Sequence, residues 1–220
     1  MYKLQKKELI GEGCCSKCYL LDDKTVYKEF KIPIYKSEIK IFSKLFEYRN
    51  ESICLPIEFI SKDKRICGYV MPRIMGETIG SCFNESNIVN MSTNSILLEK
   101  NIDYMSKGNI LMADFHAGNL MYDNEKFTII DIDSYFVPTN YSTDEVIEKN
   151  REFHRIMISN LFINNLLNDK YKRLIVDKIL PIKYSKIKTN ELIIEIKMIL
   201  DKFYKEDIKT MNQLKKIVSR

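Results

Sequence analysis

With 220 residues, 45% of them hydrophobic, the chain can bury a sizeable core but is short for two large domains. A net charge of +5, from 35 Lys and Arg against 30 Asp and Glu, is too small to indicate nucleic-acid binding. No apolar run reaches the length of a membrane span and no signal-peptide core is visible, so we expect a soluble, cytoplasmic protein that binds neither nucleic acid nor membrane.

The first expected feature is a turn between two short strands, from Leu9 to Leu20. Gly11, Gly13 and Ser16 stand there in the spacing G-x-G-x-x-S. Glycines let a backbone approach a phosphate closely because no Cβ is in the way, and Ser16 keeps the third side chain small. An ordinary turn has the same spacing, so the feature gains weight only from the elements that follow it.

A strand and a helix are expected next. Thr25 to Phe30 is a strand candidate that carries Lys28, and apolar residues four positions apart over 37–46 indicate a helix. Glu38 opens that helix and is the expected partner of Lys28.

Cys67 to Pro72 is then expected to form a buried strand that ends at a turn. The stretch from Asn84 to Ser95 is rich in Asn and Ser, and we expect it to be a loop that leads into a helix.

The most informative segment runs from 113 to 133. Asp114 and Asn119 lie five positions apart in an expected loop, and the apolar strand that follows ends on Asp131. Phosphoryl transfer requires a group that orients the attacking hydroxyl and accepts its proton, and Asp114 suits that role. Asn119 and Asp131 supply the oxygen ligands that a hard cation such as magnesium prefers.

A long helix is expected to begin near Thr143, because Ser142 to Glu145 has the form of a capping box. Its expected buried face carries Val146, Phe153, Ile156, Met157 and Leu161. Later apolar stripes indicate further helices, one ended by Pro181 and one over 192–200.

Taken in this order, residues 5–165 resemble the protein-kinase-like superfamily. The loop from Asp114 to Leu120 is similar to the D-L-H-x-G-N pattern of atypical bacterial kinases and of aminoglycoside or choline phosphotransferases. The resemblance implies an α+β, two-lobed fold. Residues 1–75 would form a small antiparallel sheet with one helix, and residues 76–220 a reduced, mainly helical lobe.

The resemblance also implies ATP and Mg²⁺ as ligands and assigns roles to residues. The implied catalytic residues are Asp114, Lys28, Glu38 and His116. Those implied to contact the nucleotide are Gly11, Gly13, Ser16, Lys28, Met71, Pro72 and Ile74, the last three around the adenine. The implied metal ligands are Asn119, Asp131 and Asp133.

The departures from the family pattern matter as well. Met112 and Ala113 replace the usual His-Arg, so no arginine is present there to receive an activation-loop phosphate, and that form of regulation is not expected. His116 either donates a hydrogen bond to the transferring phosphate or is structural. Asp133, where a glycine is usual, is either a second metal contact or a surface or capping residue.

Three hypotheses follow. The first is an active kinase whose acceptor is a protein Ser or Thr, since no acidic cluster for a cationic small molecule stands out; a small-molecule hydroxyl is the alternative acceptor. The second is a pseudokinase that binds nucleotide or a partner without turnover, and the third a structural interaction domain. Only about ten residues separate Asp131 from the next helix and no Ala-Pro-Glu motif is visible, so the usual platform for an extended peptide is not expected.

Overall fold

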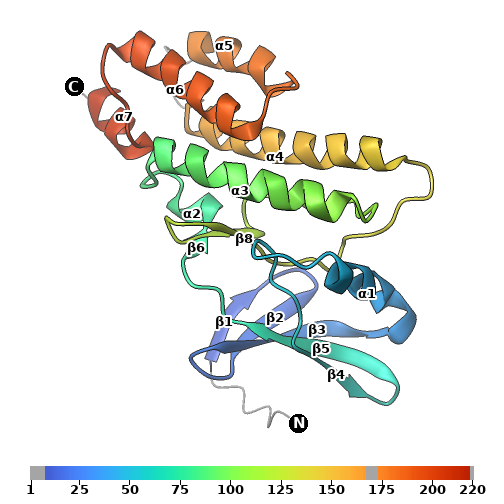
Figure 1. The fold of residues 1–220 in the computed structure, drawn as a ribbon. Helices are drawn as coiled ribbons and strands as arrows, with labels where there is room; N and C mark the ends of the chain where they lie inside the picture. The colour runs from blue at the N-terminus through green and yellow to red at the C-terminus, as the bar shows by residue number, and fades with distance from the viewer. Residues whose placement is uncertain (1–7, 167–172, 219–220) are drawn as a thin grey trace.

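The computed structural model describes residues 8–166 and 173–218 and is an α+β protein. A five-stranded antiparallel sheet lies at one end, helices form the other end, and a small three-stranded sheet lies between them (Figure 1). The strands of the large sheet are β1 (Glu8–Glu12), β2 (Ser16–Leu20), β3 (Thr25–Tyr35), β4 (Glu58–Lys62) and β5 (Arg65–Pro72), in the order β1-β2-β3-β5-β4.

Short turns set the register of this sheet. The β2–β3 turn is closed by the carboxylate of Asp22, which accepts a hydrogen bond from the backbone N–H of Lys24 at 2.8 Å. Asp63 and Lys64 join β4 to β5, and both have positive φ, the backbone twist that suits a two-residue hairpin. The two predicted strands, one carrying Lys28 and one ending at Pro72, are confirmed as β3 and β5, and the structure pairs them with each other.

One 3₁₀ helix and one α-helix cover the sheet. The 3₁₀ helix η1 (Lys36–Ile39) continues directly from β3 and leads into α1 (Lys40–Glu47). Phe42 and Leu45 of α1 are buried, as their helical spacing predicts. Glu38 lies in η1, not at the first turn of α1, so the predicted start of the α-helix was about three residues early.

The small sheet joins the two ends of the molecule. Its strands, β6 (Glu77–Thr78), β7 (Leu120–Tyr122) and β8 (Phe127–Ile129), pair in that order. The turn between β7 and β8 is held by Asp123, whose carboxylate accepts the backbone N–H groups of Glu125 and Lys126.

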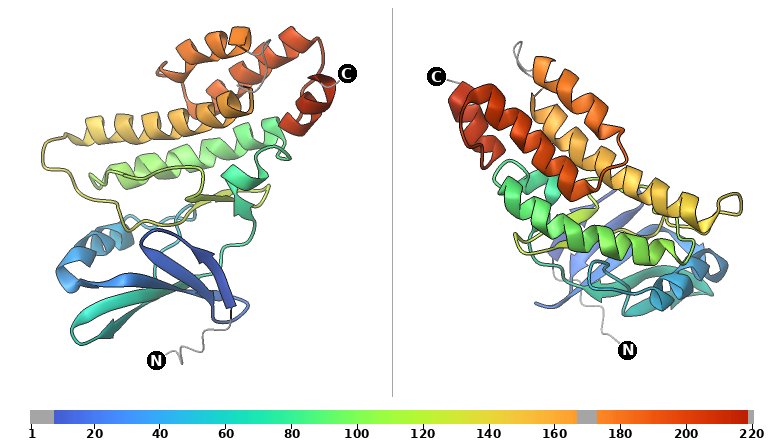
Figure 2. Two further views of the ribbon diagram at one scale, coloured as in Figure 1. Left: turned by 180° about the vertical axis from the view of Figure 1, so that it is seen from behind. Right: turned by 45° about the horizontal axis from the view of Figure 1, so that its top comes forward.

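The other end of the molecule is helical. Its described helices are α2 (Ile79–Cys82), α3 (Ile88–Ser106), α4 (Thr143–Leu166), α5 (Arg173–Lys183), α6 (Thr189–Tyr204) and α7 (Met211–Val218). Figure 2 shows α3 between the sheets and the layer formed by α4, α5 and α6. No helix in the described ranges is both long and apolar enough to cross a membrane.

Two expectations about this end need correction. The stretch 84–95 is not all loop, because α3 begins at Ile88, where Asn87 accepts the backbone N–H groups of Val89 and Asn90. Helix α5 continues past Pro181 to Lys183, although proline has no backbone N–H to donate to the carbonyl four residues earlier.

The capping box at the start of α4 is confirmed. The carboxylate of Glu145 accepts the backbone N–H of Ser142 at 2.8 Å, and the Ser142 hydroxyl accepts the N–H of Glu145 at 3.3 Å. The expected buried face is only partly right. Val146 and Met157 are buried, whereas Phe153, Ile156 and Leu161 are half-buried and line a surface groove.

Candidate functional site

Lys28 lies at the centre of a buried ionic cluster. Its ammonium is 2.5 Å from Oδ1 of Asp131 and 2.6 Å from Oδ2 of Asp133, and its side chain is only 4% exposed. The hydroxyl of Tyr69, from β5, donates to Oδ1 of Asp133 at 2.9 Å. Strands β3 and β5 and the segment after β8 therefore meet at one point, although Lys28 and Asp131 are 103 residues apart in the chain.

The environment keeps Lys28 charged. Burial alone would lower the pKa of the ammonium, but the carboxylates of Asp133 and Asp131 outweigh it and raise the pKa above its usual value. Burial also raises the pKa of the Asp133 carboxyl, against the opposing effect of Lys28 and the hydrogen bond from Tyr69. With both carboxylates ionised the cluster carries one net negative charge, which suits an incoming cation.

Asp114, His116 and Asn119 form a compact loop. The side-chain amide of Asn119 donates to the backbone carbonyl of Asp114 at 3.1 Å, and its backbone N–H donates to the carbonyl of His116 at 2.9 Å. The carboxylate of Asp114 stays open to solvent, with its side chain 59% exposed. The loop thus fixes its own backbone and leaves one carboxylate free to act on a ligand.

The orientation of His116 follows from its neighbours. Nδ1 accepts the backbone N–H of Gly118 at 3.0 Å, so in the neutral ring the proton is on Nε2. Nε2 faces Oδ1 of Asp114 at 3.6 Å. His116 therefore has a structural role in the loop and still presents an N–H beside the exposed carboxylate.

Asn119 and Asp131 are brought together by the small sheet. The backbone N–H of Ile130 donates to the carbonyl of Asn119 at 2.9 Å, so Asp131 follows immediately. Because the amide nitrogen of Asn119 is bound to Asp114, its Oδ1 is the atom available to a cation. The described residues contain no cluster of three or more His, Cys, Asp and Glu side chains, so a cation here would need oxygens from a ligand or water, as magnesium commonly does.

A cavity of about 410 Å³ lies between the large and small sheets. Its walls come from four parts of the chain. They include Ile10, Gly11 and Cys18 from the first hairpin, Val26 from β3, Met71, Pro72 and Ile74 from the end of β5 and beyond, and Met121 and Ile130 from the small sheet and its end. It borders the ionic cluster, because Cys18 pairs with Lys28 across the strands and Ile130 precedes Asp131. Four of the residues predicted to contact a nucleotide therefore share one apolar cavity.

The glycines of the first hairpin are not needed for internal packing. A Cβ placed on Gly13 would meet no atom within 4 Å, and one on Gly11 would only touch Cβ of Cys18 at 3.9 Å. The space over these two positions is therefore unfilled by the described part of the chain. Ser16 differs: it is buried at the first position of β2 and does not line the cavity.

The predicted pairing of Lys28 with Glu38 stays a prediction. The backbone of Glu38 lies in η1, but its side chain is outside the described part of the chain. Asp133, with its side chain 28% exposed, pairs with Lys28 and Tyr69 and so is more than a surface residue. Its role as a second metal contact stays a prediction. Sequence reasoning did not find Tyr69, although a single hydroxyl in the otherwise apolar strand 66–71 was an available signal.

A scan of the chain against models of protein families found no match, and a search among curated proteins found no similar sequence. Function is therefore inferred from the geometry of the site.

Proposed function

We propose that the protein is an ATP-dependent phosphotransferase with a two-lobed, protein-kinase-like fold. Residues 1–75 would form the lobe that covers the nucleotide, and residues 76–220 the helical lobe that carries the catalytic loop. The five-stranded sheet with α1 and the helical bundle beyond the small sheet support this division.

One observation carries the proposal. An apolar cavity borders the buried Lys28 and its two aspartates, and the small sheet that forms one wall of this cavity directly follows the loop with the exposed Asp114. The apolar cavity suits an adenine ring, and the open space over Gly11 and Gly13 suits phosphates. A structural ion pair alone would require neither the cavity nor the unfilled space.

The residues would divide the work as follows. Lys28 neutralises charge on the nucleotide phosphates, and Asp114 accepts the proton of the acceptor hydroxyl as its oxygen bonds to the γ-phosphorus. The bond from that phosphorus to the bridging oxygen breaks, and ADP leaves with the electron pair. Asn119, Asp131 and Asp133 would hold magnesium, which when bound supplies positive charge at the phosphates.

The acceptor we favour is a Ser or Thr of a protein. A cationic small molecule would require carboxylates beside Asp114, and none lines the surface groove next to the 114–119 loop. A small-molecule hydroxyl of another kind remains the alternative acceptor.

A second function is favoured by the cluster itself. Both carboxylates bind Lys28 closely, so they compete with nucleotide phosphates for its ammonium group. A pseudokinase that binds nucleotide without turnover would retain this arrangement.

Transfer of labelled γ-phosphate from Mg-ATP in a cell lysate separates the two functions. We expect label to appear with the intact protein and to fall by about 10³-fold or more with Asp114→Asn, because the proton acceptor is lost. The products are resolved by gel and by thin-layer chromatography, which distinguishes protein from small-molecule acceptors. Asp177→Asn, at an exposed position of α5, is the matched control and should transfer normally. Equal labelling by the intact protein and the Asp114 variant would refute the proposal.

A further inference from the structure

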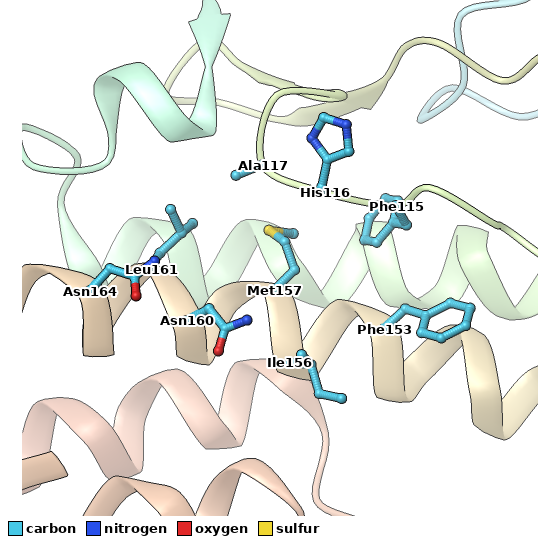
Figure 3. Close-up of a pocket in the computed structure, with 9 residues that line it drawn as sticks. All are labelled: Phe115, His116, Ala117, Phe153, Ile156, Met157, Asn160, Leu161 and Asn164. Carbon is cyan, nitrogen blue, oxygen red and sulfur yellow. The ribbon is translucent and has the colours of Figure 1, made fainter. Parts of the chain in front are cut away.

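A groove of about 280 Å³ lies beside the 114–119 loop (Figure 3). Its lining residues are Phe115, His116 and Ala117 from the loop and Phe153, Ile156, Met157, Asn160, Leu161 and Asn164 from α4. We call it the α4 groove. Figure 3 shows Met157 and Leu161 on the side of α4 that faces the loop, with Ala117 and His116 opposite them.

The groove exists because α4 has two apolar faces. One face, with His154, Ile158 and Phe162, is completely buried. On the neighbouring face Ile156 and Leu161 are half-buried and Met157 is buried, and all three line the groove. An apolar face left open beside an exposed carboxylate is a candidate binding surface.

None of the nine lining residues is Asp, Glu, Lys or Arg. Asn160 accepts a hydrogen bond at Oδ1 from the ammonium of Lys183 at 2.9 Å, which leaves its Nδ2 as a donor for a ligand. Asn164 is exposed at the rim. The groove thus offers apolar contacts with amide groups at the edge, and charged ligand groups would be desolvated there without a partner.

The groove leads to the reacting carboxylate. His116 lines it, and Nε2 of the same ring is 3.6 Å from Oδ1 of Asp114. If one side chain of a ligand fills the groove, the part of the ligand next to that side chain therefore lies close to Asp114.

We propose that the α4 groove binds an apolar side chain next to the acceptor hydroxyl, so that the preferred substrate is a protein segment in which Leu, Met or Phe adjoins the Ser or Thr. This inference rests on the proposed function. The groove is slightly smaller than pockets that enclose a whole small molecule, about 300–1,000 Å³, and suits one side chain of a larger ligand. The donor on Asn160 suits a peptide carbonyl.

The test uses the purified full chain, Mg-[γ-³²P]ATP and three synthetic peptides with one central Ser, whose next residue is Leu, Asp or Lys. We expect the Leu peptide to be labelled about tenfold or more faster than the other two, because only its side chain is desolvated at little cost.

Two variants should shift the preference from the Leu peptide toward the Lys peptide. Leu161→Glu adds a carboxylate inside the groove, and Asn164→Glu adds one at its exposed rim in case the first variant folds poorly. Each should slow labelling of the Leu peptide by about tenfold and raise the Lys-to-Leu ratio, with the affinity for Mg-ATP unchanged. Leu174→Glu, at a 63% exposed leucine of α5 outside the groove, is the matched control and should behave as the intact protein.

The outcomes separate the two proposals. Equal labelling of all three peptides, a charged preference in the intact protein, or an unchanged ratio in both groove variants would overturn the groove inference. Label found only on small molecules, with none on any peptide, would overturn it as well but would leave the phosphotransferase intact. No transfer to any acceptor, with Asp114→Asn indistinguishable from the intact protein, would refute the proposed function instead.

Discussion

Two aspartates of the candidate site hold backbone conformations that side chains rarely adopt. The φ angle is 62° at Asp114 and 56° at Asp131, in the left-handed region that Asp and Asn tolerate better than most residues. Such conformations cost energy and are concentrated at functional sites. Asparagine is therefore the replacement that removes the charge of Asp114 while disturbing its backbone least.

The hydrogen bond from Tyr69 to Asp133 leads to a prediction for single residues. Tyr69→Phe should lower the free energy of unfolding by about 1.5–3 kcal/mol at pH 7, because a buried bond to a charged group is lost. The hydroxyl favours the ionised carboxylate and so lowers its pKa; its contribution is present above the pKa of Asp133 and is lost as the pH falls through it. Urea titrations at pH 7 and pH 3 measure both effects.

Tyr135→Phe is the control for this measurement. Tyr135 is equally buried, but its hydroxyl has no hydrogen-bond partner within the described part of the chain. Removing it should leave the free energy of unfolding unchanged or raise it. An equal loss in both variants would show that packing, not the bond to Asp133, stabilises this region.

Residue types and spacing were enough to predict Lys28, Asp114, Asn119 and Asp131 as one group, and the structure brings them to one small sheet and its neighbours. Tyr69 and the partial burial of Asp133 were not predicted. Both depend on which strands are neighbours, and the ion pair between Lys28 and Asp133 joins β3 of the large sheet to the segment after β8 of the small sheet.

At the scale of elements, a capping signal predicted the start of one helix, but the composition around a second capping residue hid the start of another. Ser142 and Glu145 marked the start of α4 because both partners of the capping box lie in the sequence. Asn87 has the same role for α3 but stands among other Asn and Ser residues, so the composition predicted a loop. The open face of α4 was read as core, since periodicity alone does not tell whether another element covers it.

His154, in α4, should lower the stability of the protein in acid. Burial lowers the pKa of His154 to about 3, while the unfolded chain titrates near 6.5. Between these values the unfolded state binds a proton that the native state does not, so stability is lost as the pH falls below about 6.5, by up to about 1.4 kcal/mol per pH unit from this residue.

Unfolding titrations between pH 7 and pH 4 test this prediction. In His154→Leu the free energy of unfolding should fall less steeply with decreasing pH, by the slope that corresponds to about one bound proton. An unaltered slope in the His154 variant would contradict the prediction.

At the scale of the whole molecule, the order of strand, helix, strand and loop was predictable because each element has its own periodicity and end signals. The cavity and the α4 groove were not, since both are spaces between elements that are distant in sequence. The family-level interpretation stays a proposal, and ligand binding is its first global test.

Mg-ATP should stabilise the native protein. A ligand at 100 times its Kd adds about 2.7 kcal/mol to the free energy of unfolding, which thermal denaturation detects as a higher Tm. Gly13→Ala should unfold at the same temperature as the intact protein without nucleotide, because its Cβ would meet no atom within 4 Å, but under the proposed function it should gain less from Mg-ATP. Absence of any shift in the intact protein would favour an interaction domain that does not bind nucleotide.

Gly68 in β5 and Gly13 in the turn between β1 and β2 differ in the space around them. A Cβ on Gly68 of β5 would lie 2.1 Å from the backbone carbonyl of Lys28, so this position accepts no side chain without moving β3. The two neighbouring strands also change register beside it. Among natural variants of this sequence, a side chain at position 68 would disrupt the fold itself, whereas a small one at position 13 would leave the fold intact and, under the proposed function, would weaken only the binding of nucleotide.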